Sequence, residues 1–352
     1  MKIIIMTDME GVAGVMNSRA YCSIETSRYY DQAVELTTLE VSAAVEGALQ
    51  AGATEVLVID GHGYGAISRK LLHPRALLAG GRPTIPPIRT VLDGSYAAAM
   101  MIGQHAKANT DGGHLSHTGS FRVEDESVNG ISMGEIGQWF LLCGYYDVPV
   151  VMVSGDEAAC NEARDLVPNI ETAAVKYGIP HGSASGLTME EAKDFNCVAI
   201  HLSPDRARER IREAACLAVQ RVHEIGPLHM DPPYTFKVTN RPEKPGGRMR
   251  SATIKSTDLV ELINECRMKT KARIDPKGAF NPVADTTKRK PAKKVARKKP
   301  ARGASARKPA PTAAKKSAKK TAGKSAKPAK AGKAGKTRKS GKGAKKKSSR
   351  KR

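Results

Sequence analysis

Carboxylate and imidazole side chains follow three of the short apolar runs in this sequence. Asp8 and Glu10 come directly after the first run, Asp60 and His62 follow the second, and His105 follows the third. Ligands bind beyond the carboxyl ends of the strands in a parallel sheet, so side chains at such positions gather at one edge. If the three runs are strands of one sheet, we expect these residues to form one polar site.

The residue types at this edge suit a transition metal. Asp8 and Glu10 are two positions apart, which in extended chain places both carboxylates on the same side. Two buried negative charges are costly unless a cation lies beside them. Carboxylate oxygens together with imidazole nitrogens favour zinc or a similar divalent metal over calcium or magnesium. Loop histidines and acidic turn residues are common individually, so the hypothesis depends on their occurrence together.

Two later segments carry further candidates. A glycine-containing loop holds His114 and His117, and Glu135 follows Gly134 at the start of a predicted helix. A glutamate is stabilised at a helix N-terminus, which is a sufficient structural reason for Glu135. The neighbouring glycine permits close approach of the backbone to a ligand, which is the functional alternative. Either histidine has the alternative of being a loop residue bonded to the backbone.

Five short motifs occur in an order and at a spacing that resemble the zinc-dependent D-aminopeptidase family. They are Asp8-Met9-Glu10-Gly11, Asp60-Gly61-His62, Gly103-Gln104-His105-Ala106, Ser116-His117 and Gly134-Glu135. The triplet Ser154-Gly155-Asp156 is similar too, although by itself it is more typical of a turn. The resemblance covers roughly residues 1 to 225 and weakens beyond Tyr234. It therefore supports the metal site better than the substrate range or the assembly.

The resemblance implies a two-zinc site. Asp8 would bridge both metals, Glu10 would complete the coordination of one, and the other ligands would serve the second metal or share the pair. Those other ligands are His62, His105 and Glu135. A bridging carboxylate suits two adjacent metals and leaves open positions for water and substrate. The implied cofactor is therefore two Zn²⁺ ions per chain.

The resemblance also implies an activity. His117 matches the residue proposed in the family as the catalytic nucleophile or base, and His114 is a nearby competitor. The implied reaction is hydrolysis of short peptides with N-terminal D-amino acids, such as D-Ala-D-Ala, by a homo-oligomer for which a decamer is one implied assembly. The preference for D-residues comes from the resemblance alone. From the residues, a binuclear hydrolase of another bond, such as a phosphoester, stays an alternative.

The elements that must position these residues alternate between strands and helices. This pattern indicates an α/β fold with a mostly parallel sheet and helices on both faces. The predicted strands are Lys2–Thr7, Thr54–Asp60, Ala97–Ile102 and Val150–Val153, and the predicted helices are Met133–Cys143 and a stretch from about residue 25 to residue 50. Later segments predict a smaller C-terminal lobe or an extension of the sheet. They are a helix over Pro204–His223, a strand over Tyr234–Val238 and a helix over Thr257–Met268.

The charge of the chain is distributed unevenly. Residues 286–352 hold 29 of the 58 Lys and Arg residues, with no Asp, Glu or aromatic residue and Val295 as the one large aliphatic residue. Such a segment has too little apolar surface to offset the entropy cost of ordering. Residues 1–285 keep 29 basic against 35 acidic residues, a net charge of −6. We therefore predict a metallopeptidase-like domain over residues 1–285 and a disordered polybasic tail over residues 286–352.

The tail predicts a polyanionic partner. Repeats such as Ala292-Lys293-Lys294 and Ala318-Lys319-Lys320 resemble the C-terminal tails of linker histones, which bind DNA phosphates without sequence preference. Without aromatic residues the tail has no stacking platform, so single-strand or base-specific recognition is not supported. Two alternatives remain: a solvated extension without a partner, and a nucleoid-associated protein whose aminopeptidase-like body is only a scaffold.

The remaining composition indicates a cytoplasmic protein. The first apolar run leads directly to Asp8 and Glu10, which makes it too short and too acidic for a signal peptide. No uncharged apolar run approaches the ~20 residues of a membrane span, so we expect no membrane partner. The six cysteines are widely spaced without a CxxC motif, which favours reduced thiols.

Overall fold

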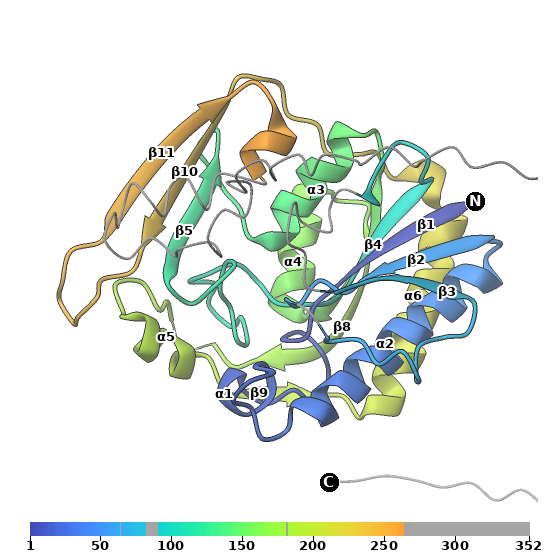
Figure 1. Cartoon of the computed structure of the whole chain (residues 1–352), viewed down its shortest axis with the longest axis horizontal. Coiled ribbons are helices and arrows are strands. Elements are labelled where there is room, and N and C mark those ends of the chain that lie inside the picture. Colours follow the sequence, from blue (N-terminus) through green and yellow to red (C-terminus); the bar gives the residue numbers. More distant parts are fainter. Residues whose placement is uncertain (64, 82–90, 181, 264–352) are drawn as a thin grey trace, which may run out of the picture. The chain divides into compact units, whose positions relative to one another are not determined.

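The computed structural model describes residues 1–63, 65–81, 91–180 and 182–263 of the chain. Within these residues the central element is a seven-stranded sheet with the order β3-β2-β1-β4-β7-β8-β9 (Figure 1). Its strands are β1 (Lys2–Thr7), β2 (Glu55–Ile59), β3 (Ala76–Ala79), β4 (Ala98–Gln104), β7 (Val150–Asp156), β8 (Glu171–Gly178) and β9 (Ala199–His201). All neighbouring pairs are parallel except β8 and β9, so the predicted mostly parallel sheet is confirmed.

The middle of the sheet is apolar because helices cover both of its faces. In β1, Ile3, Ile4 and Ile5 are fully buried, and every residue of β4 and β7 is buried. Strands covered on both faces have continuous apolar runs instead of alternating ones. Since β1 pairs with β2 on one side and β4 on the other, the ends of these three strands lie side by side.

Four long helices form the two outer layers. Helices α2 (Tyr30–Gln50) and α6 (Pro204–Gln220) pack against each other on one face, and α3 (Glu135–Tyr145) and α4 (Glu157–Leu166) lie on the other (Figure 1). The predicted helices on both faces are therefore confirmed. Three shorter helices are α1 (Ser18–Tyr21), α5 (Met189–Phe195) and the 3₁₀ helix η2 (Val222–Glu224).

A second, antiparallel sheet forms the smaller lobe. Its strand order is β11-β10-β5-β6, with β5 (Val123–Val128), β6 (Ile131–Ser132), β10 (Tyr234–Asn240) and β11 (Arg250–Ser256). A smaller lobe was expected from the C-terminal segments, and these supply β10 and β11. The other two strands come from the middle of the chain, immediately before α3. This sheet is therefore linked directly to the helix that begins with Glu135.

The boundaries of the predicted elements differ from the structure in a few places. Helix α2 begins at Tyr30 instead of near residue 25, because the preceding residues form α1 and a turn. Strands β4 and β7 run on to Gln104 and Asp156, beyond their last large aliphatic residues. Of the helix predicted over Thr257–Met268, residues 259–263 are helical and the rest lies outside the described residues.

The predicted polybasic tail over residues 286–352, and the boundary at residue 285, also lie outside the described residues. Among the residues that are described, no helix is both long and apolar enough to span a bilayer. The five cysteines of this part of the chain have free thiols.

Strands β1 and β4 approach so closely at their ends that position 103 admits only glycine. Gly103 has a φ of +79°, and a Cβ placed there would lie 2.2 Å from the Asp8 carbonyl oxygen and 2.9 Å from Cγ2 of Val12. The Asp8 N–H donates to the carbonyl of Ile102 at 2.8 Å, so the two backbones are already bonded at this point. The absence of a side chain at Gly103 therefore fixes where the backbone of Asp8 lies.

We expect Gly103→Ala to destabilise the protein more than Gly52→Ala. Both glycines have positive φ, +79° and +99°, so alanine adds backbone strain of about 1–2 kcal/mol at either position. Only Gly103 also meets backbone atoms, which adds about 1–3 kcal/mol of overpacking; nothing lies within 4 Å of a Cβ at Gly52. Urea unfolding of the two variants measures the difference. Equal losses would contradict the close approach.

Candidate metal centre

The ends of three adjacent strands bring the candidate ligands together. Asp8 and Glu10 follow β1, His62 follows β2, and His105 follows β4, while Glu135 is the first residue of α3. Among the described residues, two overlapping groups have potential ligand atoms that all lie within 4.8 Å of one another: Asp8, Glu10 and His105, and His105, His117 and Glu135. The predicted ligand His62 belongs to neither group, whereas His117 belongs to one of them.

The Asp8 carboxylate lies between two imidazoles. Its Oδ1 is 2.9 Å from Nδ1 of His62, and its Oδ2 is 3.3 Å from Nε2 of His105. The same His62 nitrogen is 3.0 Å from Oε2 of Glu10, and the same His105 nitrogen is 3.8 Å from Oε1 of Glu135. The five side chains are therefore linked through Asp8, with Glu10 and His62 in contact on one side of it and His105 and Glu135 on the other.

Each histidine is oriented by a backbone carbonyl on its far side. Nε2 of His62 donates to the Cys22 carbonyl at 2.8 Å, and Nδ1 of His105 donates to the Ala106 carbonyl at 2.9 Å. Metal-binding histidines usually donate their second N–H in this way, which fixes the ring and the tautomer. Here it leaves Nδ1 of His62 and Nε2 of His105 facing Asp8.

The charges of the cluster depend on one another. Burial raises the pKa of Asp8, but the hydrogen bonds and charges of His105 and His62 outweigh it and hold that pKa well below its usual value. Burial lowers the pKa of His105, yet the bond to Asp8 and the surrounding acids raise it to about 10. The acids likewise raise the pKa of His62 well above its usual value despite its burial. Protons on the two imidazoles balance the carboxylates in the way that a bound cation would.

The donor atoms fit a divalent metal. Within the described residues, Oε2 of Glu10 and Nε2 of His105 are buried without a hydrogen bond of good geometry, although His62 Nδ1 lies 3.0 Å from the first and Asp8 Oδ2 lies 3.3 Å from the second. Buried polar atoms normally have a well-formed hydrogen bond, and a cation held between these groups would satisfy both atoms. Oxygen and imidazole donors in this number match the coordination chemistry of zinc.

His117 lies against this cluster with one nitrogen available. Its ring stacks on His105 at 3.8 Å between centroids and on Phe121 at 4.5 Å. Nδ1 donates to the Leu115 carbonyl at 2.9 Å, which leaves the lone pair on Nε2. Burial, followed by the charge of His105, lowers the pKa of His117, so the ring is neutral at pH 7. A neutral imidazole of this kind is able to accept a proton or attack a carbonyl.

Glu135 joins the cluster from α3 and is more exposed than the other acids. Its side chain is 27% exposed, and Oε1 accepts the Gly119 N–H at 2.5 Å. The loop that holds His117 and the helix that begins with Glu135 are therefore connected directly. Gly134 is the N-cap of α3 and has no side chain to cap the helix, so Glu135 adds negative charge at that N-terminus.

Three other polar residues that the sequence analysis considered as candidates have structural roles: Asp60, Asp156 and His114. Asp60 accepts the N–H groups of Gly65 and Ala66 at 2.6 and 3.2 Å, which is turn chemistry. Asp156 is the N-cap of α4 and also accepts the His114 N–H at 2.8 Å. Nε2 of His114 donates to a carbonyl, and burial followed by the charge of Lys176 lowers the pKa of His114 to about 2. His114 is therefore bonded to backbone and separate from the ligand groups.

Sequence reasoning missed two buried charged residues that each bond to the loop after β1. Lys176 in β8 is fully buried, and its Nζ donates to the carbonyls of Glu10 and Val15. Glu40 in α2 accepts the Ala13 N–H of the same loop at 2.9 Å. Burial lowers the pKa of Lys176 to about 8 and raises that of Glu40 to about 8. The sequence signal that could have revealed them was a charged residue within an apolar pattern: Lys176 in the segment that forms β8, and Glu40 in the segment that forms α2.

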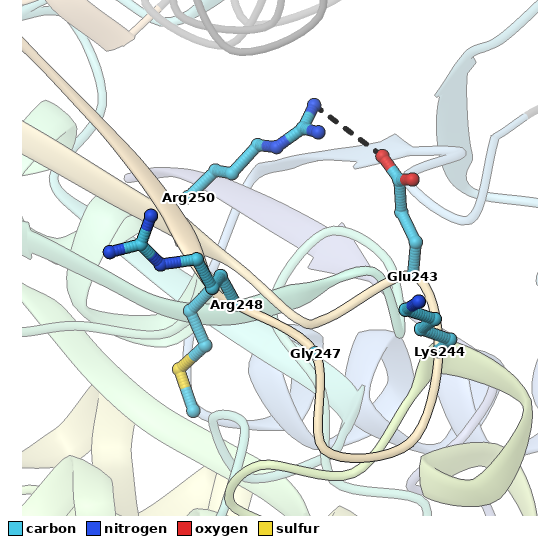
Figure 2. Close-up of a pocket in the computed structure, with 6 residues that line it drawn as sticks. Glu243, Lys244, Gly247, Arg248 and Arg250 are labelled. Carbon is cyan, nitrogen blue, oxygen red and sulfur yellow. Dashed lines mark ion pairs between the residues drawn. The ribbon is translucent and has the colours of Figure 1, made fainter.

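A separate pocket lies in the smaller lobe. At the turn between β10 and β11 a cavity of about 740 Å³ is lined by Glu243, Lys244, Gly247, Arg248, Met249 and Arg250. Figure 2 shows Arg250 directed toward Glu243, with which it forms an ion pair at 3.5 Å. This pocket belongs to the hairpin of the second sheet, and its lining includes none of the candidate ligands.

Comparison with known proteins agrees with this geometry. The family model for D-aminopeptidases, peptidase family M55, matches residues 1–272, which is further than the resemblance seen in the motifs. A D-aminopeptidase of Bacillus subtilis (strain 168) is 34% identical over 231 residues, which are 65% of this chain and 77% of the relative. A solved structure of the Zn-dependent D-aminopeptidase DppA from Bacillus subtilis, a self-compartmentalizing protease, has a TM-score of 0.67 at 26% identity and covers 80% of this chain and 100% of its own. The chain therefore belongs to the D-aminopeptidase family and is a metallo-aminopeptidase.

Proposed function

We propose that the protein is a binuclear zinc aminopeptidase that hydrolyses short peptides with N-terminal D-amino acids, such as D-Ala-D-Ala. The observation that carries the proposal is the Asp8 carboxylate, whose two oxygens each face a different imidazole. This arrangement suits a carboxylate that would bridge two metals. The Zn-dependence of the similar Bacillus subtilis structure supports the choice of metal.

In this proposal the chain's own residues hold two zinc ions. Asp8 is shared, Glu10 and His62 complete one half-site, and His105 and Glu135 complete the other. The carbonyl bonds of the two histidines fix one N–H on the outer side of each ring and direct the other nitrogen inward, where a bound metal would replace its proton. When bound, zinc supplies Lewis-acid polarisation of a carbonyl and activation of water.

His117 acts in this proposal as the nucleophile or base. The bond from its Nδ1 to Leu115 fixes the tautomer, and burial keeps the ring neutral, so Nε2 is able to take the proton or attack the scissile carbonyl. The same nitrogen is close enough to His105 and Glu135 to be a metal ligand instead. Replacing His117 by alanine distinguishes the two roles, because loss of a ligand lowers the metal content whereas loss of a base leaves it unchanged.

The substrate and setting follow from the relatives. The D-aminopeptidase of Bacillus subtilis supports peptides with D-residues, and the self-compartmentalizing DppA supports a homo-oligomer. The free thiols support a cytoplasmic location. The ligand set alone does not dictate the bond, so an aryl phosphate ester serves as the competing substrate in a hydrolysis screen: release of alanine from D-Ala-D-Ala supports the proposal, and turnover of the phosphate ester alone contradicts it.

We expect the purified protein to contain about two zinc ions per chain and Asp8→Ala to lose them. Two ions are expected because the ligand set exceeds the four ligands that one tetrahedral ion needs. Asp8 is shared by both half-sites, so its removal should release both ions together. Elemental analysis after preparation with added metal measures the content. Asp60→Ala is the control, because Asp60 caps a turn nearby and should leave the zinc content unchanged. Zinc retained in Asp8→Ala would refute the bridging role.

We expect His117→Ala to keep its zinc and lose at least about 100-fold in turnover of D-Ala-D-Ala, the typical contribution of a general base. The matched control is His114→Ala, since His114 lies three residues earlier and bonds to the backbone. Metal content and alanine release are measured on the same preparations. Turnover at the parent rate in His117→Ala, or loss of zinc with turnover, would assign the residue a different role.

A second function is proposed for residues 286–352. The segment carries 29 Lys and Arg residues and no acid, against a net charge of −6 for the rest of the chain, so it is suited to bind DNA or another polyanion through phosphates. The repeats that resemble linker-histone tails support double-stranded DNA as the first partner to test. The rival is that the aminopeptidase-like part is only a scaffold for DNA binding, without activity of its own.

We expect the full chain to bind any double-stranded DNA, with affinity falling steeply as salt rises from about 50 to 200 mM, because each neutralised phosphate releases counterion. Deletion of residues 286–352 should abolish this binding and leave peptide hydrolysis intact. Gel-shift and hydrolysis assays on both forms measure the two effects. DNA binding that survives the deletion, or hydrolysis that disappears with it, would show that the two functions are not separate.

A further inference from the structure

Glu162 on α4 bonds to two backbone segments that carry candidate ligands. Its Oε2 accepts the Lys107 N–H at 2.7 Å, and its Oε1 accepts the Gly134 N–H at 3.3 Å. Lys107 is two residues after His105, and Gly134 immediately precedes Glu135. One carboxylate therefore spans the two segments that supply the same half-site.

The packing around this carboxylate leaves little freedom. A Cβ on Gly134 would lie 2.7 Å from Cβ of Lys107 and 2.8 Å from Oε1 of Glu162. The Lys107 ammonium donates to the Ser132 carbonyl at 3.2 Å, which ties the same two segments together a second time. The loop after β4 and the turn before α3 are thus in direct contact at the position of Glu162.

The helix that carries Glu162 is capped at its N-terminus and packed on the central sheet. Helix α4 begins at the N-cap Asp156, whose carboxylate accepts the Ala159 N–H at 2.6 Å, and the helix packs on β7 and β8. Ala159 and Ala163, on either side of Glu162, are fully buried. Through its two hydrogen bonds, Glu162 therefore connects both ligand segments to a helix that is packed on the central sheet.

We propose that Glu162 is a positioning residue that sets the separation of His105 and Glu135 and thereby the zinc affinity of that half-site. It belongs to neither group of potential ligand atoms, and it acts through two backbone N–H groups. The inference rests on the proposed zinc site, of which the 3.8 Å contact between His105 Nε2 and Glu135 Oε1 is one half. A partner outside the ligand set typically changes metal affinity about 10–100-fold when it is removed.

The test compares Glu162→Gln and Glu162→Ala with the control Asp165→Asn in the full chain. Glutamine keeps one acceptor and sets an NH₂ group against the other N–H, alanine removes both acceptors, and Asp165 is an exposed carboxylate on the same helix. Competition with a chelator should give a dissociation constant raised about 10–100-fold for one of the two zinc ions in Glu162→Ala, a smaller rise in Glu162→Gln, and parent values in Asp165→Asn.

A second readout separates positioning from general destabilisation. Protein loaded with Co²⁺ should have altered visible absorption bands in the Glu162 variants, because the ligand geometry changes, while Asp165→Asn keeps the parent spectrum. Parent zinc affinity and parent spectrum in a folded Glu162→Gln would overturn the inference, and this variant decides if Glu162→Ala does not fold. A parent protein that takes up no zinc overturns the proposed function as well, whereas unchanged Glu162 variants beside a zinc-binding parent overturn the inference alone.

Discussion

The structure depends on keeping a buried carboxylate, Asp8, between two imidazoles. A negative charge in this position is costly unless positive charge surrounds it, and His62 and His105 provide that charge while they hold protons. The order of the sheet makes the arrangement possible, because β1 lies between β2 and β4 and its end is flanked by theirs. The closeness of β1 and β4 at Gly103 then fixes the backbone from which Asp8 projects.

Three charged residues outside the cluster contact the backbone segments that carry the candidate ligands. Lys176 and Glu40 both bond to the loop after β1, and Glu162 bonds to the segments that follow β4 and precede α3. Each of these contacts is made to backbone N–H or carbonyl groups, so they constrain the path of the chain without occupying the candidate ligand side chains. The geometry of the candidate site therefore depends on the sheet and on the helices that pack against it.

The sequence was informative where chemistry and local pattern coincide. We could place Asp8, Glu10 and His105 at one edge of the sheet because each follows a continuous apolar run. Such runs are typical of buried parallel strands. The motif order then indicated the family. The second sheet was only partly predictable, since β5 and β6 are short and polar, and their pairing with β10 is a contact between distant parts of the chain. Lys176 was not predictable as a support, because its role depends on burial that no local pattern specifies.

The order of these groups along the chain has a consequence for synthesis. All five candidate ligands lie between Asp8 and Glu135, whereas Glu162 and Lys176 come later, on α4 and β8. A chain leaves the ribosome from its N-terminus at about 5–20 residues per second. For a few seconds, therefore, the nascent chain contains all five candidate ligands before Glu162 and Lys176 have been added. The contacts of Lys176 with Glu10 and Val15 form only after β8 has been translated.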